Sequence, residues 1–216
     1  MRIQYFGHSC FRIISDIGTT IVCDPFDEKM VGLNMPKTKC DVVTISHHHK
    51  DHDSEENITG SYAVLDQEVA CAADDIAVQS ISTFHDEENG ARRGKDLVFN
   101  FLVDGIKVVH LGDIGFFDKK VIDKIIGCDV LMIPVGGVYT IDAKVAKKII
   151  DAVCPKIVIP MHYHTKQHAF YLENLDDFLQ LFDKEQVEIK PDSTLELDDV
   201  PQNEKAMVTV LQKYEE

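Results

Sequence analysis

The sequence predicts an α/β fold that is built from two halves. Three observations carry this prediction: the first fifty residues contain short β-branched runs, the later part alternates strand-like and helical patterns, and no Gly/Ser/Pro linker divides the chain. The sequence has no internal repeat. With 216 residues, 44% of them hydrophobic, the chain can bury a sizeable core as one large domain or two small ones.

Short strands are expected at the beginning of the chain, at residues 3–6, 10–14 and 19–23. The turn signals Gly7-His8-Ser9 and Asp16-Ile17-Gly18 separate these strands. Residues 42–45 form a continuous apolar and β-branched run, which is typical of a strand that is buried on both faces. This run leads the chain directly into a cluster of histidines.

The later part of the chain alternates between strands and amphipathic helices. Further strands are expected at residues 77–81, 97–103, 107–111, 130–133, 157–159, 187–189 and 207–211. Asp104-Gly105 lies between two of these runs and is a strong signal for a two-residue hairpin turn. Apolar spacing predicts helices after the N-cap Asp118, over residues 142–153 and over residues 175–182. The polar stretch 191–204 is expected to be a loop.

The charge balance limits the partners of the protein. There are 22 basic and 37 acidic residues, which give a formal net charge of −15. A surface this negative repels phosphate backbones, which argues against a general nucleic-acid binder. The first residues read as a strand and not as a signal peptide, and the longest charge-free stretch is shorter than the ~20 residues that cross a bilayer. We therefore expect a cytoplasmic protein without a membrane segment, whose six cysteines are reduced and mostly buried.

The histidine cluster is the strongest chemical signal in the sequence. Four of the ten histidines lie in the stretch Ser46-His47-His48-His49-Lys50-Asp51-His52-Asp53. Residues two apart in an extended segment point the same way, so His47 and His49 can grip one metal ion, and after a tight turn Asp51 and His52 can face a second. The alternative is a solvated histidine-rich loop that binds nothing. An Asp and a His at these offsets, straight after a buried strand, favour the metal site.

Two metal ions need more ligands than this one segment supplies. The candidates lie after later strand-like runs, and they are His85, His110, Asp113, His162, His164 and His168. Sites of α/β proteins form at the carboxyl ends of strands, where these residues are expected to lie. Each histidine alone would more often be a packing or surface residue, but together with the cluster they favour a metal centre.

With these residues in this order, the sequence resembles the metallo-β-lactamase superfamily of metallohydrolases. The resemblance covers residues 1 to about 166 and rests on His47, His49, Asp51, His52, His85, Gly112-Asp113 and His162. Stretches such as Asp24-Pro25-Phe26, Arg93-Gly94 and Pro134-Val135-Gly136-Gly137 are similar to those of the ascorbate-6-phosphate-lactonase-like, Zn-dependent branch. The resemblance implies an αβ/βα four-layer sandwich, in which helices flank two mixed β-sheets, and a single domain over residues 1–216.

The resemblance also implies the composition of the metal centre. One ion would be held by His47, His49 and His85, the other by Asp51, His52 and His162, and Asp113 would bridge the two. The cofactors would be two divalent ions, with Zn²⁺ first and Mn²⁺ or Fe²⁺ as alternatives. The chain departs from the branch at His48, which should point away from the metals because it alternates with the ligands, and at Lys50 and His164.

Such a centre is expected to act as a hydrolase. Two divalent ions lower the pKa of a bridging water towards ~7, and the resulting hydroxide is the nucleophile. Asp51 is expected to be the catalytic residue that orients this nucleophile. Candidates for supporting the imidazoles or contacting the substrate are Asp24, Arg93, His110 and His8, of which Arg93 suits a phosphate or carboxylate.

The expected reaction is the cleavage of a small anionic ester, lactone or phosphodiester. A nuclease or phosphodiesterase acting on nucleic acid is one alternative, and it predicts a basic patch that this sequence does not show. A di-iron redox protein would carry a carboxylate in place of His49 and an added flavin domain, and a non-catalytic metal-binding scaffold would have lost ligands. A homo-oligomer is compatible with the sequence. The sequence assigns no role to His164 or His168.

Overall fold

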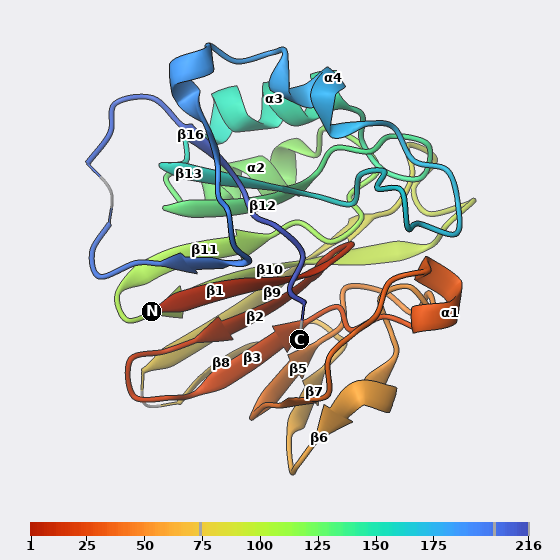
Figure 1. Ribbon diagram of the computed structural model, residues 1–216, viewed down its shortest axis with the longest axis vertical. Helices are drawn as coiled ribbons and strands as arrows, with labels where there is room; N and C mark the ends of the chain where they lie inside the picture. Colours follow the sequence, from red (N-terminus) through yellow and green to blue (C-terminus); the bar gives the residue numbers. More distant parts are fainter. Residues whose placement is uncertain (74, 201, 216) are drawn as a thin grey trace.

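The protein consists of two mixed β-sheets packed face to face (Figure 1), as seen in a computed structural model that describes residues 1–73, 75–200 and 202–215. The strand order of the first sheet is β15-β1-β2-β3-β5-β7, and that of the second is β14-β16-β13-β12-β11-β10-β9-β8. In the first sheet, antiparallel hairpins at one side continue into the parallel strands β3, β5 and β7. In the second sheet, antiparallel strands β8 to β11 continue into parallel strands from β11 onward. The expected α/β class with two halves is confirmed.

The strands have the following bounds. The first sheet contains β1 (Arg2–Gly7), β2 (Cys10–Ile14), β3 (Thr20–Cys23), β5 (Val42–Thr44), β7 (Ala63–Leu65) and β15 (Thr194–Glu196). The second contains β8 (Ala70–Ala73), β9 (Ile76–Phe84), β10 (Lys95–Val103), β11 (Ile106–His110), β12 (Val130–Pro134), β13 (Ile157–Met161), β14 (Val187–Ile189) and β16 (Met207–Val210). The expected hairpin turn is confirmed, because Asp104 and Gly105 both have positive φ and join β10 to β11.

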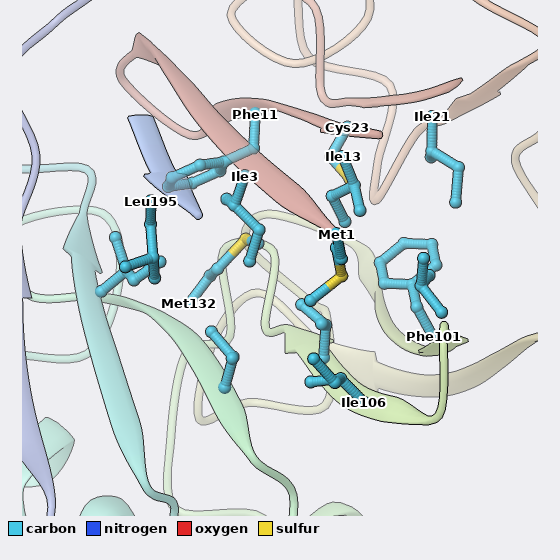
Figure 2. Packing of buried hydrophobic residues seen from close by; sticks show 14 of the residues in the cluster. Met1, Ile3, Phe11, Ile13, Ile21, Cys23, Phe101, Ile106, Met132 and Leu195 are labelled. Atoms are coloured by element: carbon cyan, nitrogen blue, oxygen red, sulfur yellow. The ribbon is translucent and has the colours of Figure 1, made fainter. Parts of the chain in front are cut away.

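The main hydrophobic core lies between the two sheets. Figure 2 shows Met1, which precedes β1, and Ile3, Ile13 and Ile21 of the first sheet pointing towards Phe101 and its neighbours in the second. All of these side chains are almost completely buried. Side chains alternate between the two faces of each strand, and those that point inward from the two sheets pack against one another. This packing joins the two halves of the chain.

Three helices cover the outer face of the second sheet. They are α2 (Lys119–Ile125), α3 (Ala143–Val153) and α4 (Leu175–Leu179), and they lie at the top of the view in Figure 1. Their apolar faces form a second buried cluster with the outer side chains of β10 to β13. Asp118 and Asp142 cap α2 and α3 by accepting backbone N–H hydrogen bonds. The sequence predicts the cap at Asp118, whereas Asp142 was expected as the first residue of its helix.

The outer face of the first sheet has a thinner cover. It consists of the one-turn helix α1 (Glu28–Val31), the coil that follows it, and the small sheet of β4 (Thr38–Lys39) and β6 (Ile58–Thr59). These segments enclose a third cluster of buried side chains around Phe6, Phe26 and Ile45. The four-layer architecture is present, with a fourth layer that contains little helix.

Several short elements differ from the expectations. The stretch 191–204, of which residue 201 lies outside the described residues, is not all loop, because β15 within it pairs with β1. The helix α4 ends at Leu179 and not at residue 182. The sequence analysis also missed α1, β4, β6, β7, β8 and the 3₁₀ turns at Glu55–Asn57 and Lys184–Gln186. These elements are very short or solvent-exposed, so their formation depends on neighbouring strands and loops rather than on a local hydrophobic pattern.

The described cysteines form no disulfide, and Cys10, Cys23, Cys40 and Cys128 are buried, whereas Cys71 and Cys154 are exposed. Among the described residues, no helix combines the length and the apolar character that crossing a membrane requires.

Candidate metal centre

The segment that follows β5 places the histidine cluster at one edge of the sandwich. The backbone N–H of His52 donates to the carbonyl of His49 at 2.8 Å, which closes the tight turn expected between the two ligand pairs. The rings of His47 and His49 lie 4.6 Å apart at nearly right angles. His48 points away, since its Nδ1 contacts the Asp53 carboxylate at 2.6 Å and its side chain is 61% exposed.

Strand ends from both halves of the fold bring further ligand candidates to this turn. Donor atoms lie within 4.8 Å of one another in three groups of side chains. The groups are His47, His49 and His85; His8, Asp51, His52 and His162; and His47, His52 and Asp113. The seven principal candidates predicted from the sequence are therefore in one place, and the structure adds His8.

Asp113 lies at the middle of these groups. Its Oδ2 atom is 3.2 Å from Nε2 of His162, 3.3 Å from Nε2 of His52 and 3.3 Å from Nε2 of His85. The Nε2 atom of His47 is 4.0 Å away. A single carboxylate oxygen thus faces at least one histidine of every group.

Several of the nitrogen and oxygen atoms that face one another in this centre have no hydrogen-bond partner among the described residues. Nε2 of His47, His52 and His162 and Oδ1 of Asp113 are buried without a hydrogen-bond partner in the described structure. Buried polar atoms are normally paired, and leaving them unpaired costs ~1–3 kcal/mol each. Imidazole and carboxylate groups that face one another in this way are a donor set that fits divalent transition metals such as zinc.

Asp24 orients one histidine on each side of the centre. Its Oδ2 atom accepts from Nδ1 of His52 at 2.9 Å and from the hydroxyl of Ser46 at 2.6 Å. The Ser46 oxygen in turn accepts from Nδ1 of His47 at 2.9 Å. Burial opposes ionisation of Asp24, but the hydrogen bond from His52 and the nearby imidazoles lower its pKa, so it accepts as a carboxylate. Both histidines therefore keep a proton on Nδ1, which leaves Nε2 as the atom that can bind a metal ion.

Asp96 is a buried acid that the sequence analysis missed. It lies at the start of β10, accepts from the backbone N–H of Asp113 at 3.0 Å, and approaches Nδ1 of His47 to 3.5 Å. Burial and the neighbouring charge of Asp113 raise its pKa well above the usual value. Its sequence surroundings, Lys95-Asp96-Leu97, resemble an ordinary polar strand start and carry no signal of this position.

The close approach of Asp96 explains the glycine before Asp113. Gly112 has φ of +55°, and a Cβ atom there would collide with the Asp96 carboxylate and with Cβ of Ser46 at 2.8 Å. We expect Gly112→Ala to lower the free energy of unfolding by ~1–3 kcal/mol and to weaken metal binding. Gly105→Ala is the matched control, because Gly105 also has positive φ but has no atom within 4 Å of the added Cβ. Chemical denaturation of both variants measures the difference, and equal losses would contradict the collision.

His8, which lies in the turn between β1 and β2, is buried next to the ligand candidates and does not lie at the rim where a substrate would be contacted. Its side chain is fully buried, and its Nε2 lies 3.3 Å from Oδ2 of Asp51. Burial and the nearby His162 lower its pKa to about 3, which keeps it neutral. Its backbone has φ of 55°, and its carbonyl accepts from the N–H of His162, which has φ of 53°. A left-handed backbone conformation is unfavourable for residues other than glycine, and such strained residues cluster at functional sites.

The proton positions along a chain of histidines show how His8 acts. The backbone N–H of Thr165 donates to Nδ1 of His168 at 3.1 Å, so the proton of His168 is on Nε2. That Nε2 lies 3.4 Å from Nδ1 of His8, which must accept, and the Nε2 proton of His8 then points to Asp51. His8 is therefore a donor that holds the Asp51 carboxylate, although its ring also lies among the ligand candidates.

The remaining candidates have different surroundings. His110 is fully buried, and its ring nitrogens contact the carbonyl of Ser9 at 2.9 Å and the N–H of Gly112 at 3.2 Å, so neither faces the ligand candidates. The backbone of His164 donates to the carbonyl of Glu173 at 2.9 Å. Arg93 lies at the rim of the centre, where it lines a cavity of about 440 Å³ together with His49, Asp51, His85 and Asp113.

Comparison with known proteins identifies the class of protein that this fold and site define. A family model described as a beta-lactamase superfamily domain matches residues 2–162, the part of the chain that holds the whole centre from His8 to His162. The domain is thus of the metallo-β-lactamase class, as the resemblance in the sequence implies.

Individual relatives narrow the class. A UPF0173 metal-dependent hydrolase of Methanosphaera stadtmanae is 31% identical in an alignment of length 204 that covers 76% of this chain and 85% of that protein. Another UPF0173 metal-dependent hydrolase, of Staphylothermus marinus, is 30% identical in an alignment of length 196 that covers 76% of this chain and 83% of that protein. A Thermotoga maritima structure, described as a candidate Zn-dependent hydrolase of the metallo-beta-lactamase superfamily, has a TM-score of 0.80 and 39% identity over 98% of this chain and 99% of that one. The chain therefore belongs to the UPF0173 metal-dependent hydrolases of this superfamily.

Proposed function

We propose that this hydrolase uses a dinuclear metal centre to cleave a small anionic ester, lactone or phosphodiester. The observation that carries the proposal is the position of Asp113, whose Oδ2 faces histidines of both flanking groups. One ion would be held by His47, His49 and His85, and the other by Asp51, His52 and His162, with Asp113 between them. Zinc is the first candidate, with manganese and iron as the alternatives.

The residues of the chain would divide the work around such ions. Divalent ions there would supply an activated water as the nucleophile and polarise the bond to be cleaved. Asp51 would orient the nucleophile, because its carboxylate is only partly buried and faces the cavity. The hydrogen bond from His8 and the nearby His52 lower the pKa of Asp51, although burial opposes them, so Asp51 acts as an acceptor. Asp24 and Ser46 would keep His47 and His52 in the tautomer that binds metal.

The cavity supports a small substrate and not a polymer. Its volume of about 440 Å³ is at the small end of ligand pockets. With a formal net charge of −15, the chain would repel nucleic acid, which weakens the alternative of a nuclease. We propose further that residues 1–216 form a single metallo-β-lactamase-like domain. The cytoplasmic location and the homo-oligomeric assembly stay predictions.

Metal removal tests the proposal. We expect protein purified with supplemented zinc to contain about two metal ions per chain by mass spectrometry and to hydrolyse bis(p-nitrophenyl) phosphate or a member of a lactone panel. Chelation should abolish the hydrolysis, and added metal should restore it. Protein that binds no transition metal under metal-replete conditions, or whose activity survives complete metal removal, would contradict the proposal.

A further inference from the structure

The cavity beside the metal centre has an apolar part. Besides the ligand candidates, it is lined by three apolar side chains, Met30, Tyr139 and Phe170, which come from three separate segments and are here called the apolar wall. Met30 and Tyr139 are 47% and 39% exposed, so two of the three side chains present apolar surface in the same cavity. Exposed apolar surface gathered in a concave site marks ligand contact.

The aromatic part of this wall is fixed in position. The rings of Tyr139 and Phe170 lie 5.9 Å apart at 82°, and the ring of Phe170 is also 5.7 Å from that of His8. The loop before Tyr139 keeps Val138, a β-branched residue, at φ of 59°, a conformation that costs ~1–3 kcal/mol. The segment with Phe170 is held at both sides, by the bond from Ala169 N–H to the Val31 carbonyl and by that from Glu173 N–H to the Gly136 carbonyl. A flat group could therefore enter a preformed corner between two rings.

Arg93 adds a positive charge at the same corner. Its guanidinium lies over the ring of Tyr139 with Cζ 5.4 Å from the centroid, and one N–H donates to the Val138 carbonyl at 3.2 Å. The backbone of Arg93 is fixed because its N–H donates to the Asp86 carboxylate at 2.8 Å. In the described part of the chain no carboxylate lies within 4 Å of the guanidinium, although the protein has 37 acidic residues. A guanidinium has five N–H donors, so the remaining ones can serve an anion.

The neighbouring arginine shows that this arrangement is specific to one position. Arg92 also donates its backbone N–H to Asp86, but its side chain is 68% exposed and pairs with Glu88. Among the described residues that line the cavity, the carboxylates are Asp51 and Asp113, which belong to the metal centre. The positive charge of Arg93 is therefore left for a bound molecule.

We infer that the substrate of this centre is a compact anion that carries a flat apolar group, such as an aromatic ring. Arg93 binds the anionic group, and the corner formed by Tyr139, Phe170 and Met30 stacks against the flat group. The inference rests on the proposed hydrolase function and narrows its substrate class. Sugar phosphates and other wholly polar anions would leave the apolar wall unused.

Binding of phosphonates to zinc-loaded protein tests this inference without a reaction. We expect calorimetry to show phenylphosphonate binding about tenfold or more tightly than methylphosphonate, with cyclohexylphosphonate between them, because the phenyl ring buries apolar area and stacks. Arg93→Gln should weaken both phenyl- and methylphosphonate by about tenfold, whereas Arg92→Gln should change neither. Tyr139→Leu should weaken phenylphosphonate more than methylphosphonate, because it removes the stacking surface as well as the ring under Arg93. Tyr171→Leu, at an exposed tyrosine outside the cavity lining, is its control.

Equal affinities for phenyl- and methylphosphonate, or equal effects of Arg93→Gln and Arg92→Gln, would overturn the inference. Cyclohexylphosphonate that binds as tightly as phenylphosphonate would overturn the requirement for a flat group. A failure of the inference can be distinguished from a failure of the proposed function. Hydrolysis without a phenyl preference contradicts the inference alone, and the expected binding pattern without any hydrolysis contradicts the proposed function alone.

Discussion

His47→Ala is expected to remove one metal ion per chain, whereas His48→Ala should leave the metal content of the protein unchanged. His47 is buried and belongs to two of the three ligand groups. Its loss would leave the proposed first ion with His49, His85 and the shared Asp113. His48 is adjacent in the chain but faces Asp53 at the surface. Since metal ions contribute several kcal/mol to hydrolysis and each 1.4 kcal/mol is a factor of ten, we expect His47→Ala to lower kcat/KM by about 10³-fold.

Mass spectrometry of the two variants, purified side by side with supplemented zinc, measures the metal content. Circular dichroism checks that both variants keep the secondary structure of the parent protein. Loss of metal in both variants would show that His48 also contributes to metal binding, against the arrangement in which only His47 and His49 face the centre. Full metal content in His47→Ala would remove His47 from the ligand set.

Asp24→Asn is expected to weaken zinc binding by about 10- to 100-fold, the usual cost of losing a carboxylate that orients a ligand. The Asn amide that replaces one carboxylate oxygen is a donor, and it would face Nδ1 of His52 and the hydroxyl of Ser46. His52 would then have to move its proton to Nε2, the atom that faces Asp113. The lone pair needed for a metal would no longer be available.

Competition with a chromophoric zinc chelator measures this change in affinity. Asp53→Asn is the matched control, because Asp53 also contacts a histidine of the same segment, but the exposed His48. We also expect Asp24→Asn to lower the stability of the metal-free protein, since it leaves buried donors poorly paired. An unchanged zinc affinity in Asp24→Asn would refute the role of this carboxylate in setting the tautomers.

The longer elements of the fold were predictable because their signal is local. The strands β2 and β12 and the helices α2 and α3 have apolar patterns and caps that the chain carries by itself. The strands β7 and β8 have mostly exposed side chains, and no pattern distinguishes them from loops. β15 consists of three residues in a polar stretch, and it is a strand because β1 offers its open edge. Pairing energy of this kind depends on the neighbour and not on the segment.

The candidate site divides in the same way. The turn from His47 to His52 was predictable, because the geometry of five or six consecutive residues follows from their spacing. The position of His85, Asp113 and His162 in one centre was expected from the resemblance to a family and from their place after strands. Asp96 carried no such signal, since it matters only through its contact with the Asp113 backbone. His8 was a candidate of uncertain role until the chain of proton donors from Thr165 was visible.

The sequence by itself determined the types of ligand, the local turn that presents four of them, and the charge that disfavours nucleic acid. The tertiary structure decided which side chains face the same point and how their protons are arranged. It also brought Met30, Tyr139 and Phe170 to one cavity and placed Arg93 over Tyr139, where none of the described carboxylates pairs with it. The physical reason is range: spacing along a strand or turn fixes neighbours within a few residues, whereas contacts between strand ends depend on the order in which the two sheets pair and pack.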